Sequence, residues 1–154
     1  IIYELLEMIR TTLFRQAMFA EFEKSVHEKI ENGEVLSSDD LSEIYYKLNE
    51  EYFGKDCVID EQIKHEWARI PHFYTPFYVY KYATGISAAI IIATNILSGK
   101  EGYVEKYIDM LKQGCTKKAV ELLKMVDVDL EDINTYKGAI DFYRELTEKL
   151  KELI

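Results

Sequence analysis

The amino-acid sequence predicts an all-α fold, a multi-helix bundle without β-strands. Apolar residues recur every three or four positions over most of the chain, and glycines or prolines separate these periodic segments. No segment alternates polar and apolar residues as a half-buried strand does. The run Ile90-Ile91-Ile92 resembles a strand, but it continues a long segment flanked by Ala88 and Ala93, and that length favours a buried helix.

The first helix is expected to span residues 1 to about 32, because one apolar stripe runs along it and Asn32-Gly33 is a typical C-terminal stop. A second helix is expected from Ser37 or Ser38, both favoured N-cap residues, to about Phe53. The stripe of the first helix consists of Leu5, Ile9, Leu13, Met18, Phe22, Val26 and Ile30.

A third helical piece is expected from about Asp60 until Pro71, which cannot continue a helix. Pro76 suits the first turn of a fourth helix that extends to Ser98-Gly99. Small residues on this fourth helix predict a face where another helix backbone comes close: Gly85, Ala88 and Ala89.

Three further helices complete the expected fold, at about residues 101 to 113, 116 to 126 and 134 to 153, with Gly114 between the first two. The sequence contains no internal repeat, low-complexity tract or linker. Residues 1–154 are therefore predicted to form a single helical unit.

Composition and charge exclude several classes of protein. A net charge of -9 and an isoelectric point near 4.9 argue against nucleic-acid binding and against binding to anionic membranes, because both need basic patches. The longest apolar run, Ile86 to Ala93, is far shorter than the roughly 20 residues that cross a bilayer. Cys57 and Cys115 fit neither a disulfide framework nor a metal motif, which favours reduced thiols in a cytosolic protein.

The most informative segment is residues 70–85, which gathers hydrogen-bond donors near the expected start of the fourth helix. Its donors are His72 and the hydroxyls of Tyr74, Tyr78, Tyr80 and Tyr82. Such donors suit a developing oxyanion. An aromatic core stripe is the competing interpretation, and the residues alone leave both open.

Helical geometry from Pro76 onward would place Tyr78 and Tyr82 on one face, with Tyr80 on the neighbouring face. Phe73 and Phe77 are assigned to the core, because aromatic residues at helical spacing are usually packing residues. This division leaves the tyrosines to line a polar cleft.

A metal site is not expected from this chain. His65-Glu66-Trp67-Ala68-Arg69 begins like the zinc motif His-Glu-x-x-His, but Arg69 stands where the second histidine is needed. We therefore expect His65 and Glu66 to form a solvated pair on a helix that buries Trp67 on its other face. His27 is expected to be exposed, and three histidines are too few for a histidine-rich metal site.

Several segments together resemble the oligoendopeptidase F family, the bacterial zinc metallopeptidases similar to thimet oligopeptidase. The run Pro-His-Phe-Tyr, then Phe-Tyr-Val-Tyr and Tyr-Ala-Thr-Gly, is similar to the substrate-binding motif of that family. Residues 10–23, 48–54 and 66–74 match in the same order. Two departures from the family pattern are Thr75-Pro76, often Tyr-Asn in the family, and Lys81, often Gln.

The resemblance implies the C-terminal part of a zincin-like oligopeptidase catalytic domain, acting on short peptides in the cytoplasm. It places the zinc ligands upstream of this chain, so zinc would belong to the full-length enzyme and no residue here would bind it. It implies that His72 and Tyr80, and next Tyr78, stabilise the transition state, while Tyr74 and Tyr82 contact the oligopeptide substrate.

The chain begins at Ile1 already in helical rhythm, without an initiator Met or an N-cap, which favours a piece of a longer polypeptide. Alone, it is expected to be inactive and to expose an apolar face that docks on the N-terminal, zinc-bearing part of the protein or on a second copy. The alternative is a non-catalytic helical module that binds a protein or peptide through the aromatic segment.

Overall fold

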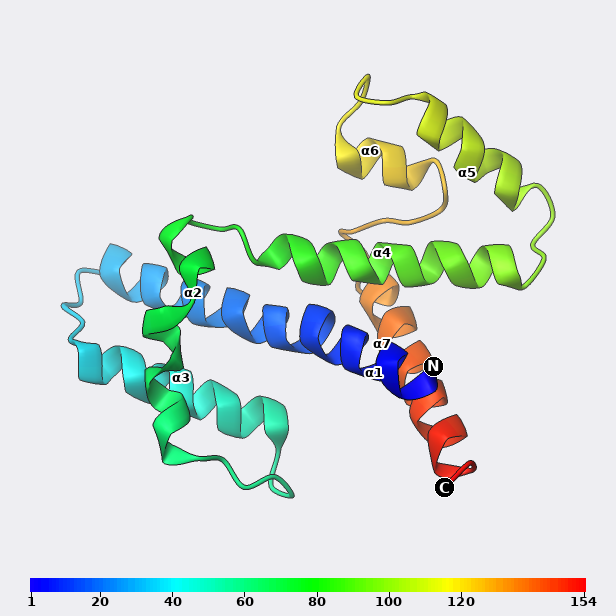
Figure 1. Ribbon diagram of the computed structural model, residues 1–154. Helices are drawn as coiled ribbons and strands as arrows, with labels where there is room; N and C mark the ends of the chain where they lie inside the picture. Colours follow the sequence, from blue (N-terminus) through cyan, green and yellow to red (C-terminus); the bar gives the residue numbers. More distant parts are fainter. The chain divides into compact units, whose positions relative to one another are not determined.

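The computed structural model describes residues 1–154 and contains helices but no strands, which confirms the all-α prediction (Figure 1). No helix is long and apolar enough to cross a membrane. In chain order the elements are α1 (Ile2–Ile9), a π-helical segment (Arg10–Phe14), α2 (Arg15–Glu31), α3 (Ser38–Phe53), 3₁₀ helices Glu61–Arg69 and Pro71–Tyr74, α4 (Tyr80–Leu97), α5 (Tyr103–Lys112), α6 (Ala119–Lys124) and α7 (Ile133–Lys151).

The helices form two compact units, one of residues 11–83 and one of residues 1–10 with 84–154. The prediction of a single helical unit over residues 1–154 stays a prediction. Cys57 and Cys115 are both exposed and unpaired thiols, as expected.

The expected N-terminal helix is present as a run of consecutive helical residues, but it includes the π-helical segment that the sequence did not predict. The predicted stripe is buried at Ile9, Leu13, Met18 and Phe22, whereas Ile30 near its end is exposed. Burial therefore stops before the helix does.

Within residues 11–83, α3 packs against both α2 and the 3₁₀ helix Glu61–Arg69. Ser37 begins α3 as predicted: its hydroxyl accepts the Asp40 backbone N–H at 3.3 Å, and the Asp40 carboxylate accepts the Ser37 N–H at 2.8 Å. Aromatic rings dominate the core, whose buried members are Met18, Phe19, Phe22, Tyr45, Leu48, Ile70 and Val79.

Glu66 is buried in this unit, so the prediction of a solvated His65–Glu66 pair is wrong. Its carboxylate accepts the Tyr45 hydroxyl from α3 at 2.6 Å and the Arg15 guanidinium from α2 at 2.6 Å, and Arg69 also donates to it. Burial opposes its charge, but these hydrogen bonds and the two guanidinium charges prevail and lower the pKa of Glu66. Three helices therefore meet at one carboxylate.

The other side of the same 3₁₀ helix carries Trp67, which is half-buried. Its indole N–H donates to the Ser42 hydroxyl at 3.1 Å, and Ser42 donates in turn to the Ser38 carbonyl at 2.8 Å. The predicted burial of Trp67 is thus partly met, with its one polar atom satisfied.

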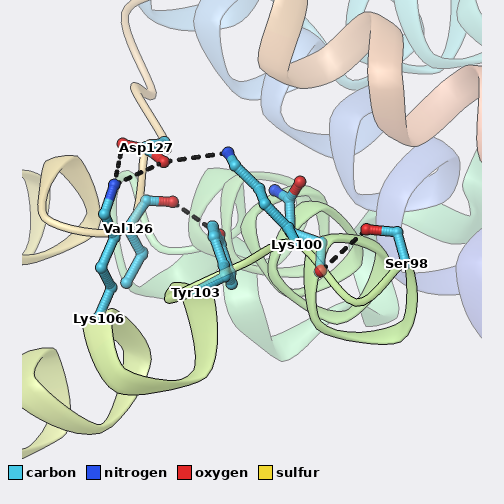
Figure 2. A network of polar contacts seen from close by, with 7 residues as sticks. Ser98, Lys100, Tyr103, Lys106, Val126 and Asp127 are labelled. Atoms are coloured by element: carbon cyan, nitrogen blue, oxygen red, sulfur yellow. Dashed lines mark hydrogen bonds and ion pairs between the residues drawn. The ribbon is translucent and has the colours of Figure 1, made fainter.

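In the other unit, α1 packs against α7, and a second core surrounds Tyr103 at the start of α5. Tyr103 is buried and its hydroxyl donates to the Val126 carbonyl at 2.7 Å (Figure 2). The next residue, Asp127, has a left-handed φ of 59°. Its carboxylate accepts hydrogen bonds from the ammonium groups of Lys106 and Lys100, each at 3.1 Å. Hydrogen bonds from these lysines lower the pKa of Asp127.

Close helix packing occurs at Gly138 on α7 rather than at Gly85. A Cβ added to Gly138 would lie 2.7 Å from Cδ1 of Ile91 on α4, whereas one added to Gly85 would meet nothing within 4 Å. Of the predicted small residues, Ala88 is buried, but Gly85 and Ala89 are exposed. The prediction is therefore wrong for Gly85, and the close approach of a helix at Ala88 stays a prediction.

We expect Gly85→Ala to raise the free energy of unfolding by about 1 kcal/mol, because alanine favours a helix and the site is open. Gly138→Ala should leave the free energy of unfolding unchanged or lower it, since the added methyl group must displace the Ile91 side chain. Adding Ile91→Val removes the contacting atom and should recover part of the helix-propensity gain. Urea unfolding measures all three, and equal gains at both glycines would contradict the close contact.

We expect Glu66→Gln to lower the free energy of unfolding by about 2 kcal/mol at neutral pH, because it removes a buried charge with several donors. Since folding lowers the pKa of Glu66, its contribution is complete above the ordinary glutamate pKa and is lost as pH falls through the lower folded value. Urea unfolding from pH 7 to acid should therefore show the two proteins converging. Glu61→Gln, at an exposed carboxylate, is the control and should change little. If the two proteins differed by the same free energy of unfolding at all pH values, the ionised state of Glu66 could not be the source of its stabilising effect.

Candidate functional site

The donor segment folds as a short 3₁₀ helix, Pro71–Tyr74, followed by a turn and then by α4. The expected helix start at Pro76 is wrong, because α4 begins at Tyr80. Phe77 has a left-handed φ of 56°, which a right-handed helix excludes. Pro76 therefore initiates a turn rather than a helix, the other position that its fixed φ favours.

Three of the predicted site residues lie together: His72, Tyr78 and Tyr82. The His72 ring lies 5.5 Å from the Tyr78 ring and 5.7 Å from the Tyr82 ring, and the two tyrosine rings are 5.7 Å apart. The Tyr82 hydroxyl and Nε2 of His72 are 3.3 Å apart, a hydrogen bond whose donor depends on the imidazole tautomer. We call these three residues the His–Tyr cluster.

Tyr78 and Tyr82 were predicted to meet on one helical face, and they meet although Tyr78 precedes the helix. A hydrogen bond with Tyr78, then partial burial, raises the pKa of Tyr82. Tyr82 thus remains a neutral phenol at neutral pH. The Lys81 ammonium lies 4.9 Å from the centre of the Tyr78 ring, which adds a positive charge beside the cluster.

The other two tyrosines are placed differently. Tyr74 is 78% exposed, and its hydroxyl donates to the Ala68 carbonyl at 3.3 Å. Tyr80 is 50% exposed at the first residue of α4. The roles assigned to all five residues stay predictions.

The two phenylalanines of the segment also separate. Phe73 is half-buried and packs on Phe19 and Phe22 at 5.5 Å and 5.2 Å, as predicted. Phe77 is 52% exposed, so its assignment to the core is wrong. Its ring lies 4.7 Å from the His27 ring, which makes His27 half-buried rather than exposed.

Sequence reasoning missed Glu23, a buried residue of α2 whose carboxylate accepts the Phe77 backbone N–H at 2.6 Å. The signal was a charged residue one position after Phe22 of the apolar stripe and one turn after Phe19. A glutamate at a buried helical position needs a partner, but the sequence does not say which one.

The residues of this chain do not fit a zinc ion. Zinc needs three or four ligands from nitrogen, sulfur or oxygen, and no group of three His, Cys, Asp or Glu side chains lies close enough to hold a metal. In the one sequence that begins like a zinc motif, the Glu66 carboxylate is occupied by Tyr45 and two arginines.

A polar groove of about 690 Å³ lies elsewhere in the same unit, against α3 and the 3₁₀ helix Glu61–Arg69. Most of the charged side chains that line it form ion pairs with one another: the Lys47 ammonium lies 2.6 Å from the Glu43 carboxylate, and the Lys64 ammonium lies 2.8 Å from the Glu61 carboxylate. No member of the His–Tyr cluster lines it. The cluster, with its hydroxyl and imidazole groups, remains the better candidate site.

Comparison with known proteins shows the family to which the chain belongs. The model of peptidase family M3 matches residues 1–142. Oligopeptidase PepF of Bacillus subtilis is 43% identical over 154 residues, which cover 100% of this chain and 23% of that protein. An oligoendopeptidase F homolog of Borreliella burgdorferi is 43% identical over 143 residues, or 93% of this chain and 24% of that protein.

Solved structures agree with these sequence relatives. The crystal structure of oligoendopeptidase-F from Enterococcus faecium matches with a TM-score of 0.95 and 39% identity, over 99% of this chain and 29% of that one. A putative peptidase from Chlamydophila abortus matches with a TM-score of 0.93 and 37% identity, over 99% of this chain and 26% of that one. The chain thus spans about a quarter of the length of its relatives, and it belongs to peptidase family M3.

Proposed function

We propose that this chain is the C-terminal helical portion of a zinc metalloendopeptidase that hydrolyses short peptides in the cytoplasm. Membership of peptidase family M3 and the names of its relatives, oligopeptidase and oligoendopeptidase, support peptide hydrolysis by the full-length protein. Zinc would be bound by residues outside this chain. The same membership favours this proposal over a non-catalytic binding module.

The observation that carries the proposal is the His–Tyr cluster, which occupies the segment resembling the family's substrate-binding motif. Hydrolysis of a peptide bond places negative charge on the former carbonyl oxygen, and neutral or cationic donors stabilise that charge without any change in their own charge. His72 and Tyr78 are such donors, held by ring contacts with each other and with Tyr82 and by the hydrogen bond between His72 and Tyr82. Tyr80, the further proposed donor, and Tyr74, a proposed substrate contact, are both exposed.

In the proposed mechanism His72 and Tyr80 donate to the developing oxyanion, with Tyr78 beside them, and Tyr82 and Tyr74 contact substrate. Tyr82 also orients the imidazole through its hydrogen bond to Nε2.

The partner of this chain is, in the same proposal, the N-terminal part of its own protein. The relatives are about four times as long, and α5 carries an exposed apolar stripe one or two turns long. Its members follow helical spacing: Val104, Ile108 and Leu111. Such a stripe would be covered by the rest of the polypeptide or, in isolation, by a second copy.

In the complete protein, we expect Tyr80→Phe to lower kcat and kcat/KM together by roughly 100-fold, because it removes a hydrogen bond made mainly in the transition state. His72→Ala should have a similar effect. The matched control is Tyr52→Phe, which also removes one phenolic hydrogen bond, to Glu21 at 2.9 Å, but away from the cluster. Steady-state kinetics on a fluorogenic oligopeptide decides the matter, and unchanged kcat and kcat/KM in both Tyr80→Phe and His72→Ala would refute the donor role.

We also expect the isolated chain of residues 1–154 to hold no stoichiometric zinc and to hydrolyse no oligopeptide, because it offers no group of metal ligands. The complete protein should be active, lose activity to a chelator and regain it with zinc. Elemental analysis and peptide turnover measure both properties. One equivalent of zinc retained by the pure chain through chelator dialysis would contradict this division of roles.

A further inference from the structure

Glu23 is an unusual side chain for its position. It is 6% exposed, on the face of α2 that also buries Phe19 and Phe22. Burying a carboxylate is unfavourable unless it is hydrogen-bonded, so an apolar residue would pack here at lower cost. The buried Glu23 carboxylate therefore needs a hydrogen-bond donor as its partner.

That partner is a backbone N–H in a strained turn. Oε1 of Glu23 accepts the Phe77 N–H at 2.6 Å. Phe77 has a φ of 56°, a conformation that residues with a Cβ rarely adopt unless the surroundings hold them there. The carboxylate supplies that hold.

A second contact from the same helix acts on the same residue. His27 lies one helical turn beyond Glu23, and its ring packs on the Phe77 ring at 4.7 Å. Glu23 thus binds the backbone of Phe77 while His27 binds its side chain. Both contacts join α2 to a turn that is 54 residues distant in sequence from Glu23.

The turn separates the two halves of the His–Tyr cluster. His72 precedes it on the 3₁₀ helix Pro71–Tyr74, and Tyr78 and Tyr82 follow it. Val79, just after the turn, is fully buried, whereas Tyr78 is partly exposed. The path of the chain at Phe77 therefore decides whether the Tyr78 ring reaches His72.

We propose that Glu23 is a positioning residue for the candidate site: its carboxylate fixes the Phe77 turn and thereby holds Tyr78 and Tyr82 against His72. The inference rests on the proposed function for its catalytic consequence, although its structural part does not. Glu23 acts through the turn and touches none of the cluster residues in this role.

The test uses hydrogen exchange read by mass spectrometry on the complete protein, with overlapping peptides that isolate the Phe77 amide. Glu23→Met keeps the length and burial of the side chain but removes the acceptor, so this amide should exchange at least about tenfold faster. Glu23→Gln keeps an acceptor oxygen and should retain most of the protection. Unchanged exchange in Glu23→Met would overturn the proposal.

Glu21→Met is the matched control, because it removes a carboxylate of the same helix that accepts the Tyr52 hydroxyl instead. It should leave the Phe77 amide protected, and equal loss of protection in both variants would overturn the specific role of Glu23. If Glu23→Met fails to fold, Glu23→Asp replaces it, since its shorter side chain keeps the charge but retracts the acceptor from Phe77.

Peptide hydrolysis by the same proteins separates this inference from the proposed function. Glu23→Met should lower kcat/KM at least about tenfold, with recovery in Glu23→Gln. Faster exchange without any loss of kcat/KM would overturn the positioning role while leaving the peptidase intact. If the unaltered protein hydrolyses no oligopeptide, the proposed function fails, and the exchange experiment still decides whether Glu23 fixes the turn.

Discussion

The buried carboxylate of Glu66 is the interaction on which the unit of residues 11–83 depends. Apolar burial drives helices together but is non-directional, so the apolar stripes alone tolerate small sliding and rotation. Glu66 removes that freedom, because Arg15 from α2 and Tyr45 from α3 must both reach it. An arrangement without either contact leaves the buried Glu66 carboxylate with too few hydrogen-bond donors. The free energy lost in that case exceeds the stabilisation that the intact ion pair provides.

Glu66 also lies shortly before the donor segment in the chain. The 3₁₀ helix that carries it ends at Arg69, and Ile70 enters the core directly before Pro71–Tyr74 and its His72. In the middle of the segment, Glu23 holds the Phe77 turn and Val79 enters the same core. Buried residues thus anchor the segment at Ile70 and at Val79, while its tyrosines remain partly exposed.

Periodicity and capping predicted the helices because those signals are local. Ser37 caps α3 as expected, and the closing helix begins within one residue of its predicted start, at Ile133. The errors occur where a distant partner decides the outcome. Pro76 suits a helix start and a turn equally well, and the contacts that accompany the turn, those of Glu23 and His27 with Phe77, come from residues about 50 positions away in the sequence. The candidate site was predicted from its residue types and family resemblance and stays a prediction, whereas the sequence did not indicate which partners its supporting carboxylates bind.

The carboxylate of Glu23 can hold the turn whatever side chain stands at position 77. Its acceptor meets a backbone N–H, which every residue except proline offers whatever its side chain. The family departure at Thr75-Pro76 lies before this N–H and leaves it intact, and a proline directly before a left-handed residue is a common turn arrangement. Side chains at positions 75 and 76 are therefore free to change the approach to the cluster, while Glu23 keeps the exit at Phe77, and with it Tyr78, fixed.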